Sequence, residues 1–244
     1  MLQRLFIFLL IFLILPDIYL YLRFIVHLTA KRWLRILYWL PAFLLSTGLL
    51  YLVYFSNNAF AERHIQAIGW FSIFFFLFTA PKLLLSLCTI IGVPFHKWLR
   101  WPRTPFICTG LTLAVISIVM IIYGSFIGRT QFDVKEVTYS SPKLPSAFDG
   151  YRIVQLSDIH IGSWQGNASA IQKLVKLVNE QQADLIVFTG DLVNHRAVEL
   201  NDFQDILSGL KAKDGVYSIL GNHDYGPYFR WKSKDEQDDN LNDL

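Results

Sequence analysis

Three short polar segments near the C-terminus contain the side chains of this 244-residue chain that are best suited to chemistry. They are Asp158-Ile159-His160, Gly190-Asp191 and Gly221-Asn222-His223-Asp224. Carboxylate and amide oxygens mixed with imidazole nitrogens suit a pair of divalent transition-metal ions. Such a pair is a common means of activating water against a phosphate ester. The residue types therefore predict a metal centre for hydrolysis.

Each polar segment directly follows a run of residues that predicts a buried β-strand. The three runs are 151–156, 184–189 and 216–220. Asn167 and Asn201 are predicted to cap two intervening helices, whose apolar faces are Ile171, Leu174, Val175 and Val178, and Phe203, Ile206, Leu207 and Leu210. Strands alternating with helices imply right-handed crossovers and a mostly parallel sheet. The carboxyl ends of its strands face one crevice, where we expect the segments to meet.

In this order the three segments resemble the signature of the calcineurin-like metallophosphoesterases, which is Asp-x-His, then Gly-Asp, then Gly-Asn-His-Asp or Gly-Asn-His-Glu. The resemblance covers roughly residues 150–225. Read without it, the same pattern also suits a nucleotide-binding α/β domain with solvated Asp and His residues in its loops. Asp158 taken alone suits a cap or turn, and Asn222 taken alone suits an ordinary turn.

The resemblance implies a role for each metal ligand. Asp158 and His160 would bind a first ion, Asp191 would bridge both ions, and Asn222 would bind the second through its amide oxygen. A carboxylate can bridge because its two oxygens reach ions about 3.5–4 Å apart. Manganese is favoured, and iron or zinc also suit this ligand set.

The resemblance also implies the catalytic residues. His223 would donate to the phosphate and assist the leaving group, and Asp224 would orient it. The attacking group would be a hydroxide activated by both metals, and the substrate a phosphate monoester, diester or pyrophosphate. His195 lies outside the motif and is expected to be a surface loop residue, while Asp224 has the alternative role of closing its turn.

The chain departs from the family pattern after Asp224. Complete members continue with a lone His and a Gly-His-x-His element, but none of the six histidines here follows His223. We therefore expect residues 151–244 to be the N-terminal part of such a domain, with an incomplete second metal site and weak or no activity. Two alternatives remain, a membrane-anchored binding or scaffolding remnant and a transporter or sensor with an enzymatic relic.

The charges divide the chain into two halves. Up to Arg129 there are two acidic residues against eleven Lys or Arg, whereas seventeen acidic residues face eleven basic ones afterwards. Nothing in the second half resembles a nucleic-acid-binding stripe, so no nucleic-acid partner is expected. Cys88 and Cys108 lie in apolar runs, which argues against a disulfide framework.

The first half predicts a transmembrane region over residues 1–129. Its four apolar runs, 5–26, 33–55, 68–93 and 106–127, are each long enough to cross a bilayer, which needs about 20 residues. No cleavage site typical of a signal peptide follows the first run. Lys82, beside Pro81, is expected to snorkel from a kinked or re-entrant helix pair. The lipid bilayer is thus the predicted partner of this half.

The cations predict the orientation. Lys31, Arg32 and Arg35 lie in the first connection, Lys97, Arg100 and Arg103 in the third, and Arg63 with Glu62 in the second. Positive-inside bias places the first and third connections in the cytoplasm, and hence the soluble half outside it, as in a bacterial inner-membrane protein.

The expected fold is thus a four-helix transmembrane region followed by an α/β unit, a partial metallophosphoesterase sandwich of strands and crossover helices. Residues 130–150 would form a linker with a short edge strand at Phe132, Val134 and Tyr139. A membrane anchor is compatible with a lipid-linked phosphate ester as the substrate.

Overall fold

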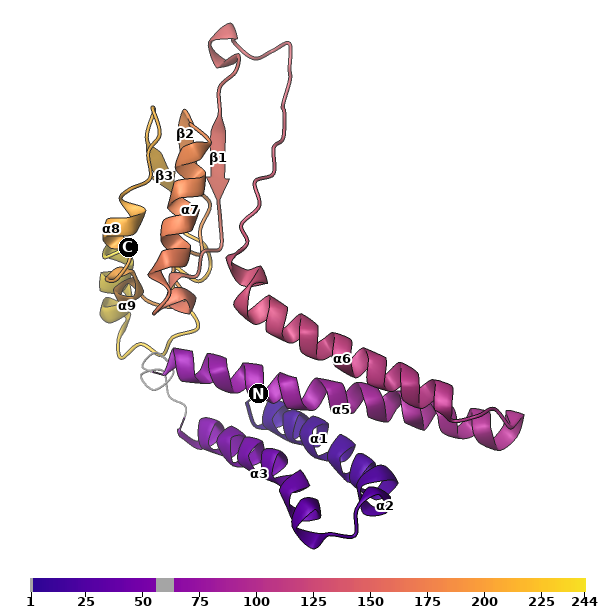
Figure 1. Ribbon diagram of the computed structural model, residues 1–244. Helices are drawn as coiled ribbons and strands as arrows, with labels where there is room; N and C mark the ends of the chain where they lie inside the picture. Colours follow the sequence, from indigo (N-terminus) through magenta and orange to yellow (C-terminus); the bar gives the residue numbers. More distant parts are fainter. Residues whose placement is uncertain (1, 56–63) are drawn as a thin grey trace. The chain divides into compact units, whose positions relative to one another are not determined.

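The computed structural model describes residues 2–55 and 64–244, and the chain divides into two compact units after Gln131 (Figure 1). Glu62 and Arg63, used above to predict the orientation, lie outside the described residues. Each unit is described by itself below.

The first unit is helical. Helix α1 (Leu2–Leu20) continues through a π-helical turn, η1 (Tyr21–Ile25), into the short α2 (Val26–Leu28). Helices α3 (Arg32–Phe55), α5 (Ile65–Leu99) and α6 (Thr104–Phe126) follow, and successive long helices alternate in direction (Figure 1). Four segments are long and apolar enough to span a membrane: Phe6–Leu28, Arg32–Tyr54, Ile65–Leu99 and Thr104–Thr130. The four predicted spans are confirmed.

An apolar cluster joins three of these helices. Leu13 of α1, Leu45 and Leu49 of α3, and Phe75 of α5 are buried against one another. Glycine permits the close approach of α3 and α5, because a Cβ at Gly48 would lie 2.5 Å from the Phe71 ring. Many of the other large apolar side chains are exposed, as expected for a lipid-facing surface.

Lys82 does not snorkel, and α5 is one continuous helix rather than a re-entrant pair. The Lys82 Nζ atom lies 2.6 Å from Oδ1 of Asp17, whose side chain is fully buried. The Tyr38 hydroxyl donates to the same Asp17 oxygen at 2.9 Å. Asp17 stands at the centre of the span Phe6–Leu28 and Lys82 at the centre of Ile65–Leu99. Lys82 needs no path to water, because its counter-charge lies inside the unit.

In the second unit, the connecting segment does not form the predicted strand. No strand is assigned between Gln131 and Ser140, and the side chains of Val137 and Tyr139 are 90% and 77% exposed. Their apolar pattern does not produce a strand because no neighbouring strand pairs with this segment within the described residues. A 3-10 turn, η3 (Ser146–Phe148), leads into the sheet.

The sheet has three parallel strands in the order β1 (Ile153–Leu156), β2 (Leu185–Phe188) and β3 (Val216–Ser218). Ile153 pairs with Leu185, and Ile186 pairs with Val216. The Tyr151 hydroxyl donates to Asp214 Oδ2 at 2.7 Å, which ties the start of β1 to the turn before β3. This hydrogen bond raises the pKa of Tyr151 to about 12. The predicted parallel α/β arrangement is confirmed.

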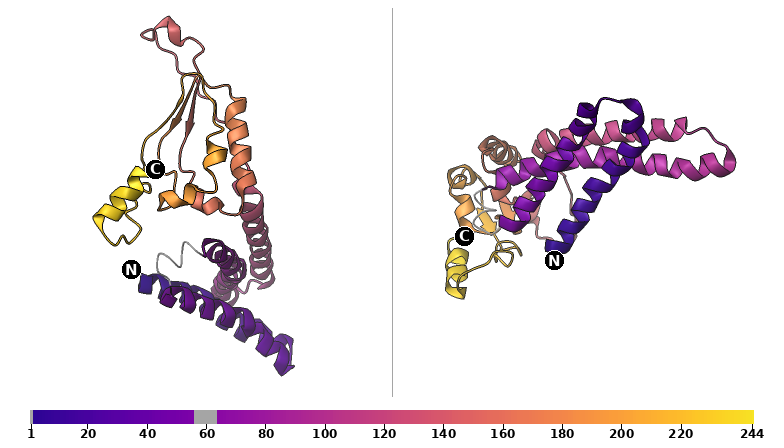
Figure 2. Two further views of the ribbon diagram at one scale, coloured as in Figure 1. Left: turned by 90° about the vertical axis from the view of Figure 1, so that its left-hand side faces the viewer. Right: turned by 90° about the horizontal axis from the view of Figure 1, so that it is seen from below.

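Helix α7 (Ala168–Glu180) lies alongside the sheet (Figure 2). Its predicted apolar face is confirmed, since Ile171, Val175 and Val178 are buried. Asn167 occupies the N-cap position, but its side-chain oxygen accepts from the Ser169 hydroxyl at 3.0 Å and does not cap the backbone.

The second predicted helix is much shorter than expected. A 3-10 turn, η5 (Ala197–Leu200), precedes α8 (Gln204–Leu207), so the prediction that Asn201 caps a helix was wrong. Phe203 takes the N-cap position, and its ring is buried in the core. The last element is the polar helix α9 (Lys234–Asn242), whose first turn is capped by the Ser233 hydroxyl.

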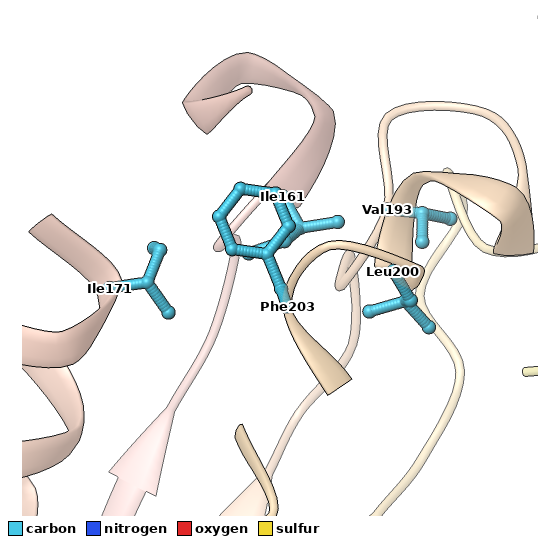
Figure 3. Close-up of a cluster of buried hydrophobic side chains, with 5 residues drawn as sticks. All are labelled: Ile161, Ile171, Val193, Leu200 and Phe203. Carbon is cyan, nitrogen blue, oxygen red and sulfur yellow. The ribbon is translucent and has the colours of Figure 1, made fainter. Parts of the chain in front are cut away.

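A cluster of five buried side chains includes two residues that closely follow predicted site residues in the chain (Figure 3). Ile161 follows His160, and Val193 comes two residues after Asp191. Both are 0% exposed and pack with Ile171, Leu200 and Phe203. Burying such a side chain contributes about 1.5–3 kcal/mol, so the core fixes the backbone on which the polar residues stand.

The ion pair in the first unit gives a testable expectation. Lys82→Met leaves the Asp17 carboxylate buried without its counter-charge, and we expect it to lower the free energy of unfolding by about 3–5 kcal/mol. Combining it with Asp17→Asn removes both charges and should restore most of the stability. Unfolding of the detergent-solubilised chain, followed by helical circular dichroism, measures both effects. Lys97→Met, at an exposed lysine, is the control. An equally large loss in the double variant would contradict the ion pair.

Candidate metal centre

The loops after β1 and β2 are hydrogen-bonded to each other beyond the ends of the strands. The backbone N–H of Asp158 donates to Gly190 O at 3.0 Å, and that of His160 donates to Asp191 O at 3.1 Å. Ile161 continues the ladder with a 2.8 Å bond to Leu192 O. This ladder places the first two polar segments side by side.

Three of the predicted site residues hold a left-handed backbone conformation. The φ angles of Asp158, His160 and Asp191 are 55°, 48° and 59°. Such conformations cost roughly 1–3 kcal/mol each and persist only where surrounding contacts impose them. Their concentration at the ends of β1 and β2 is typical of a functional site.

His160, Asp191 and His223 form a compact set of potential metal ligands. One ligand atom from each lies within 4.8 Å of the other two, and the rings of His160 and His223 have centroids 4.5 Å apart. Two imidazoles and a carboxylate are an N/O donor set that fits manganese, iron or zinc. The structure therefore brings residues of all three predicted segments together.

Asp158 and Asn222 lie at the margin of this set. The Asp158 side chain is 65% exposed, with Oδ1 3.9 Å from Nε2 of His160 and Oδ2 in contact with the Ser157 hydroxyl. The Asn222 amide nitrogen donates to the Tyr228 hydroxyl at 3.2 Å. Because the nitrogen is engaged in this way, the amide oxygen of Asn222 is the atom left to serve as a ligand.

The His223 ring is oriented by a backbone carbonyl and not by Asp224. Nδ1 of His223 lies 2.8 Å from the carbonyl oxygen of Asn194. A carbonyl can only accept, so Nδ1 carries a proton and Nε2 is the nitrogen available for chemistry. Asp191 Oδ1 accepts from the backbone N–H of His223 at 2.8 Å, which holds these two residues together.

Asp224 instead joins two loops through their backbones. Its carboxylate is 1% exposed and accepts four N–H bonds of 2.7–3.1 Å, from Gly221, Asp191, Leu192 and Val193. The bond from Gly221 closes Asp224's own turn, which is the alternative role given above, and any orienting effect on His223 would pass through the backbone. Its carboxylate is drawn to a set of N–H groups that would otherwise be buried without partners.

Glu199 is a second buried carboxylate of this kind, and the sequence did not point to it. It is 6% exposed and accepts the backbone N–H groups of Asn194, His195 and Arg196 at 2.7–3.1 Å. These bonds fix the loop whose Asn194 carbonyl holds His223. A lone acid in a polar loop has no distinctive pattern, so only the Glu199 contacts reveal its role.

His195 and Tyr228 flank the site. His195 is half-buried and stacks on His223 at 6.2 Å, so it is not the surface loop residue that was expected. Its Nδ1 atom is buried without a hydrogen-bond partner among the described residues. The Tyr228 ring lies 4.7 Å from that of His223. No sequence motif marks Tyr228, which follows the last polar segment.

Glycine is required where the loops after β2 and β3 cross. A Cβ at Gly190 would lie 2.4 Å from the Gly221 nitrogen, and a Cβ at Gly221 would lie 2.3 Å from Asp191 Oδ1. Gly190 also has a φ of 101°, a region that L side chains rarely adopt. The two glycines thus let Asp191 approach the His223 loop.

Parallel strands that present imidazole and carboxylate ligands at their carboxyl ends define a metal-site α/β protein, here preceded by four apolar helices. Residues 3–129 match the family model described as "Probable Calcineurin-like phosphoesterase, transmembrane domain", and residues 151–243 match "Calcineurin-like phosphoesterase". The chain belongs to the calcineurin-like metallophosphoesterases with an N-terminal four-helix transmembrane domain.

Three curated relatives are 30–36% identical to this chain over 43–50% of its length. A zebrafish (Danio rerio) transmembrane protein with metallophosphoesterase domain is 36% identical over 46% of this chain and 25% of its own length. The uncharacterised Bacillus subtilis metallophosphoesterase YkuE is 34% identical over 43% and 37%. The Chlamydia muridarum UDP-2,3-diacylglucosamine pyrophosphatase LpxG is 30% identical over 50% and 39%.

The matched stretch thus spans between a quarter and two fifths of the length of these relatives. No solved structure matches the chain.

The glycine crossing generates a testable expectation about metal binding. Gly221→Ala places a methyl group against Asp191 and should displace its carboxylate, weakening manganese binding by about 10–100-fold. Titration calorimetry on the solubilised chain measures this change. Gly124→Ala is the control, because an added Cβ there meets no atom within 4 Å. Unchanged affinity in Gly221→Ala would show that Asp191 is not a ligand.

Proposed function

We propose that this protein is a metal-dependent phosphoesterase whose reaction is centred on His160, Asp191 and His223. The observation that supports it most directly is the convergence of these ligand atoms within 4.8 Å at the carboxyl ends of parallel strands. Membership of the calcineurin-like metallophosphoesterases supplies the reaction class.

Metal ligation is assigned to Asp158, His160, Asp191 and Asn222. Two divalent ions, when bound, neutralise phosphate charge and lower the pKa of water. Asp191 holds its position through the His223 N–H bond, and the amide of Asn222 is oriented by Tyr228. Asp158 must turn toward His160 to join the set, since its Oδ1 now lies 3.9 Å from that ring.

His223 acts on the substrate side. The Asn194 carbonyl keeps a proton on Nδ1, so Nε2 alone exchanges protons with the substrate. In its protonated form Nε2 donates to a phosphate oxygen and then to the departing oxygen, as a general acid. Asp224 supports this role by fixing the loops that carry Asp191 and His223.

The substrate class is proposed to be a lipid-linked phosphate ester or pyrophosphate. The Chlamydia relative is named for hydrolysis of a diacylated nucleotide sugar. In this chain the transmembrane helices keep the catalytic unit near a bilayer. A membrane-embedded substrate would then reach the site by lateral diffusion.

Activity is best tested in a chimera that continues this chain with the remaining C-terminal part of the Bacillus subtilis relative. With manganese it should hydrolyse p-nitrophenyl phosphate or its bis ester, and Asp191→Ala should abolish turnover. His223→Ala should slow turnover by about 10²–10⁴-fold. Asp205→Ala, at an exposed acid of α8, is the control and should retain full rate.

The 244-residue chain itself provides a second readout. Among the described residues the second ion has only Asp191 and Asn222 as proposed ligands, so metal analysis of this polypeptide should find at most about one manganese ion per chain, with negligible hydrolysis. Turnover that survives Asp191→Ala in either protein would refute the assigned roles.

We further propose that the soluble unit lies outside the cytoplasm, because seven cations occur at or near the first and third connections. Alkaline phosphatase fused after Gly150 should be active, whereas a fusion at Arg100 in the third connection should be inactive. The reverse pattern of activities would overturn this orientation.

A further inference from the structure

His195 lies beside His223 on a loop whose backbone is fixed. Its backbone N–H donates to Glu199 Oε1 at 2.9 Å, and a Cβ at Gly226 would lie 3.2 Å from its carbonyl oxygen, so the loop after β3 packs against it. The rings of His195 and His223 are stacked, with centroids 6.2 Å apart and planes inclined by 28°. His195 is thus held next to the proposed proton donor, outside the compact set of three potential metal ligands.

The surroundings of the two ring nitrogens indicate where the proton of neutral His195 lies. Nδ1 is buried and has no hydrogen-bond partner among the described residues. Orphaned N–H groups are rare in protein interiors, whereas an unpaired acceptor is tolerated more often, so Nδ1 carries the lone pair. Neutral imidazole has one donor and one acceptor nitrogen, which places the proton on Nε2. In the part of the chain that the structure describes, Nε2 is neither buried nor bonded to a protein group, so this N–H faces solvent.

His223 has the opposite arrangement. Its Nδ1 is protonated against the Asn194 carbonyl, so the lone pair of the neutral ring is on Nε2. The two stacked imidazoles therefore present one N–H donor, on His195, and one nitrogen that can exchange a proton, on His223. Cleavage of a phosphate ester uses both kinds of group. One exchanges a proton with the departing oxygen, and the other donates to an oxygen that stays on phosphorus.

The other side-chain donors of this loop are engaged within the protein. The Asn194 amide nitrogen donates to Ser163 Oγ at 2.8 Å, and its amide oxygen accepts the Ser163 backbone N–H at 3.2 Å. The Arg196 guanidinium carbon lies 5.1 Å from the centroid of the Phe229 ring, and the Nε atom of Arg196 is buried. The Nε2–H of His195 is therefore the donor of this loop that is best placed beside His223.

We propose that His195 is a substrate-binding residue, which donates from Nε2 to a phosphate oxygen that stays on phosphorus. The ring acts in its neutral form, so no change in its protonation is needed. It holds the phosphate in place while His223 exchanges a proton with the departing oxygen. This inference rests on the proposed function, because it adds a contact to the substrate of the same site.

The unsubstituted chain tests the tautomer directly. The full-length protein is prepared with isotope-labelled histidine rings, held in nanodiscs, loaded with zinc at mildly alkaline pH, and studied by solid-state NMR. We expect a protonated Nε2 on His195 and a protonated Nδ1 on His223, and inorganic phosphate should shift the His195 Nε2–H signal. Loss of a signal in His195→Gln assigns it. A proton on Nδ1 of His195 would overturn the proposal, and this result stands even if a variant fails to fold.

Two substitutions separate hydrogen bonding from packing. His195→Phe keeps a stacked ring but has no donor, and should weaken the binding of inorganic phosphate to the zinc-loaded chain by about 10–100-fold, the usual value of a hydrogen bond to a charged group. His195→Gln loses the ring but keeps an N–H of similar reach, and should retain most of the affinity. Titration calorimetry measures both. His96→Phe, at an exposed histidine of the helical unit, is the control.

Zinc affinity separates the role of His195 from that of the metal ligands. It should be unchanged in His195→Phe, and an equal fall in zinc and phosphate affinity would show that His195 is a metal ligand instead. Equal phosphate affinity in His195→Phe and the unsubstituted chain would overturn this inference and leave the proposed function intact. An unsubstituted chain that binds neither zinc nor phosphate would overturn the proposed function, and this inference with it.

Discussion

The geometry of the candidate metal centre depends on one buried carboxylate, that of Asp224, which acts through backbone N–H groups. Asp224 accepts N–H bonds from both the loop that carries Asp191 and the loop that carries His223. Without it, several N–H groups would lose their partners in a region that water does not reach, at a cost of about 1–3 kcal/mol each. The strained backbone of Asp191 and the close approach of Gly221 both rely on this attachment.

The buried Glu199 carboxylate likewise accepts backbone N–H groups, here from residues 194–196 of the same loop. By binding three successive N–H groups it fixes the Asn194 carbonyl, which in turn sets the tautomer of His223. Two carboxylates thus act through the backbone, which leaves the side chains of His160 and Asp191 free for a metal ion and that of His223 free for the substrate. Ile161 and Val193, from the loops after β1 and β2, are buried in an apolar cluster with Phe203, which holds these loops in place (Figure 3).

The sequence predicts the helices and strands of this protein well, but it does not predict which side chains contact one another. The length of the apolar runs is sufficient to find the four spans. The spacing of apolar residues locates α7, and the polar motifs at the strand ends locate β1, β2 and β3. The contacts of Asp224, Glu199 and Tyr228 are not encoded in spacing, because they join residues that meet only when the loops cross. Lys82 was misread for the same reason, since its partner lies 65 positions earlier in the chain.

The surroundings of the two buried aspartates, Asp17 and Asp224, differ in how the negative charge is balanced. This difference explains why the α/β unit attracts a cation and the helical unit does not. Asp17 is neutralised by Lys82 and by the Tyr38 hydroxyl, so its charge is balanced within the helices. Asp224 is solvated by N–H dipoles, which stabilise its charge but do not cancel it. With Asp191 and Asp158 close to the same loops, negative charge accumulates at the strand ends. A divalent cation is the partner that this field attracts most strongly, and the imidazole of His160 is placed to supply a nitrogen ligand.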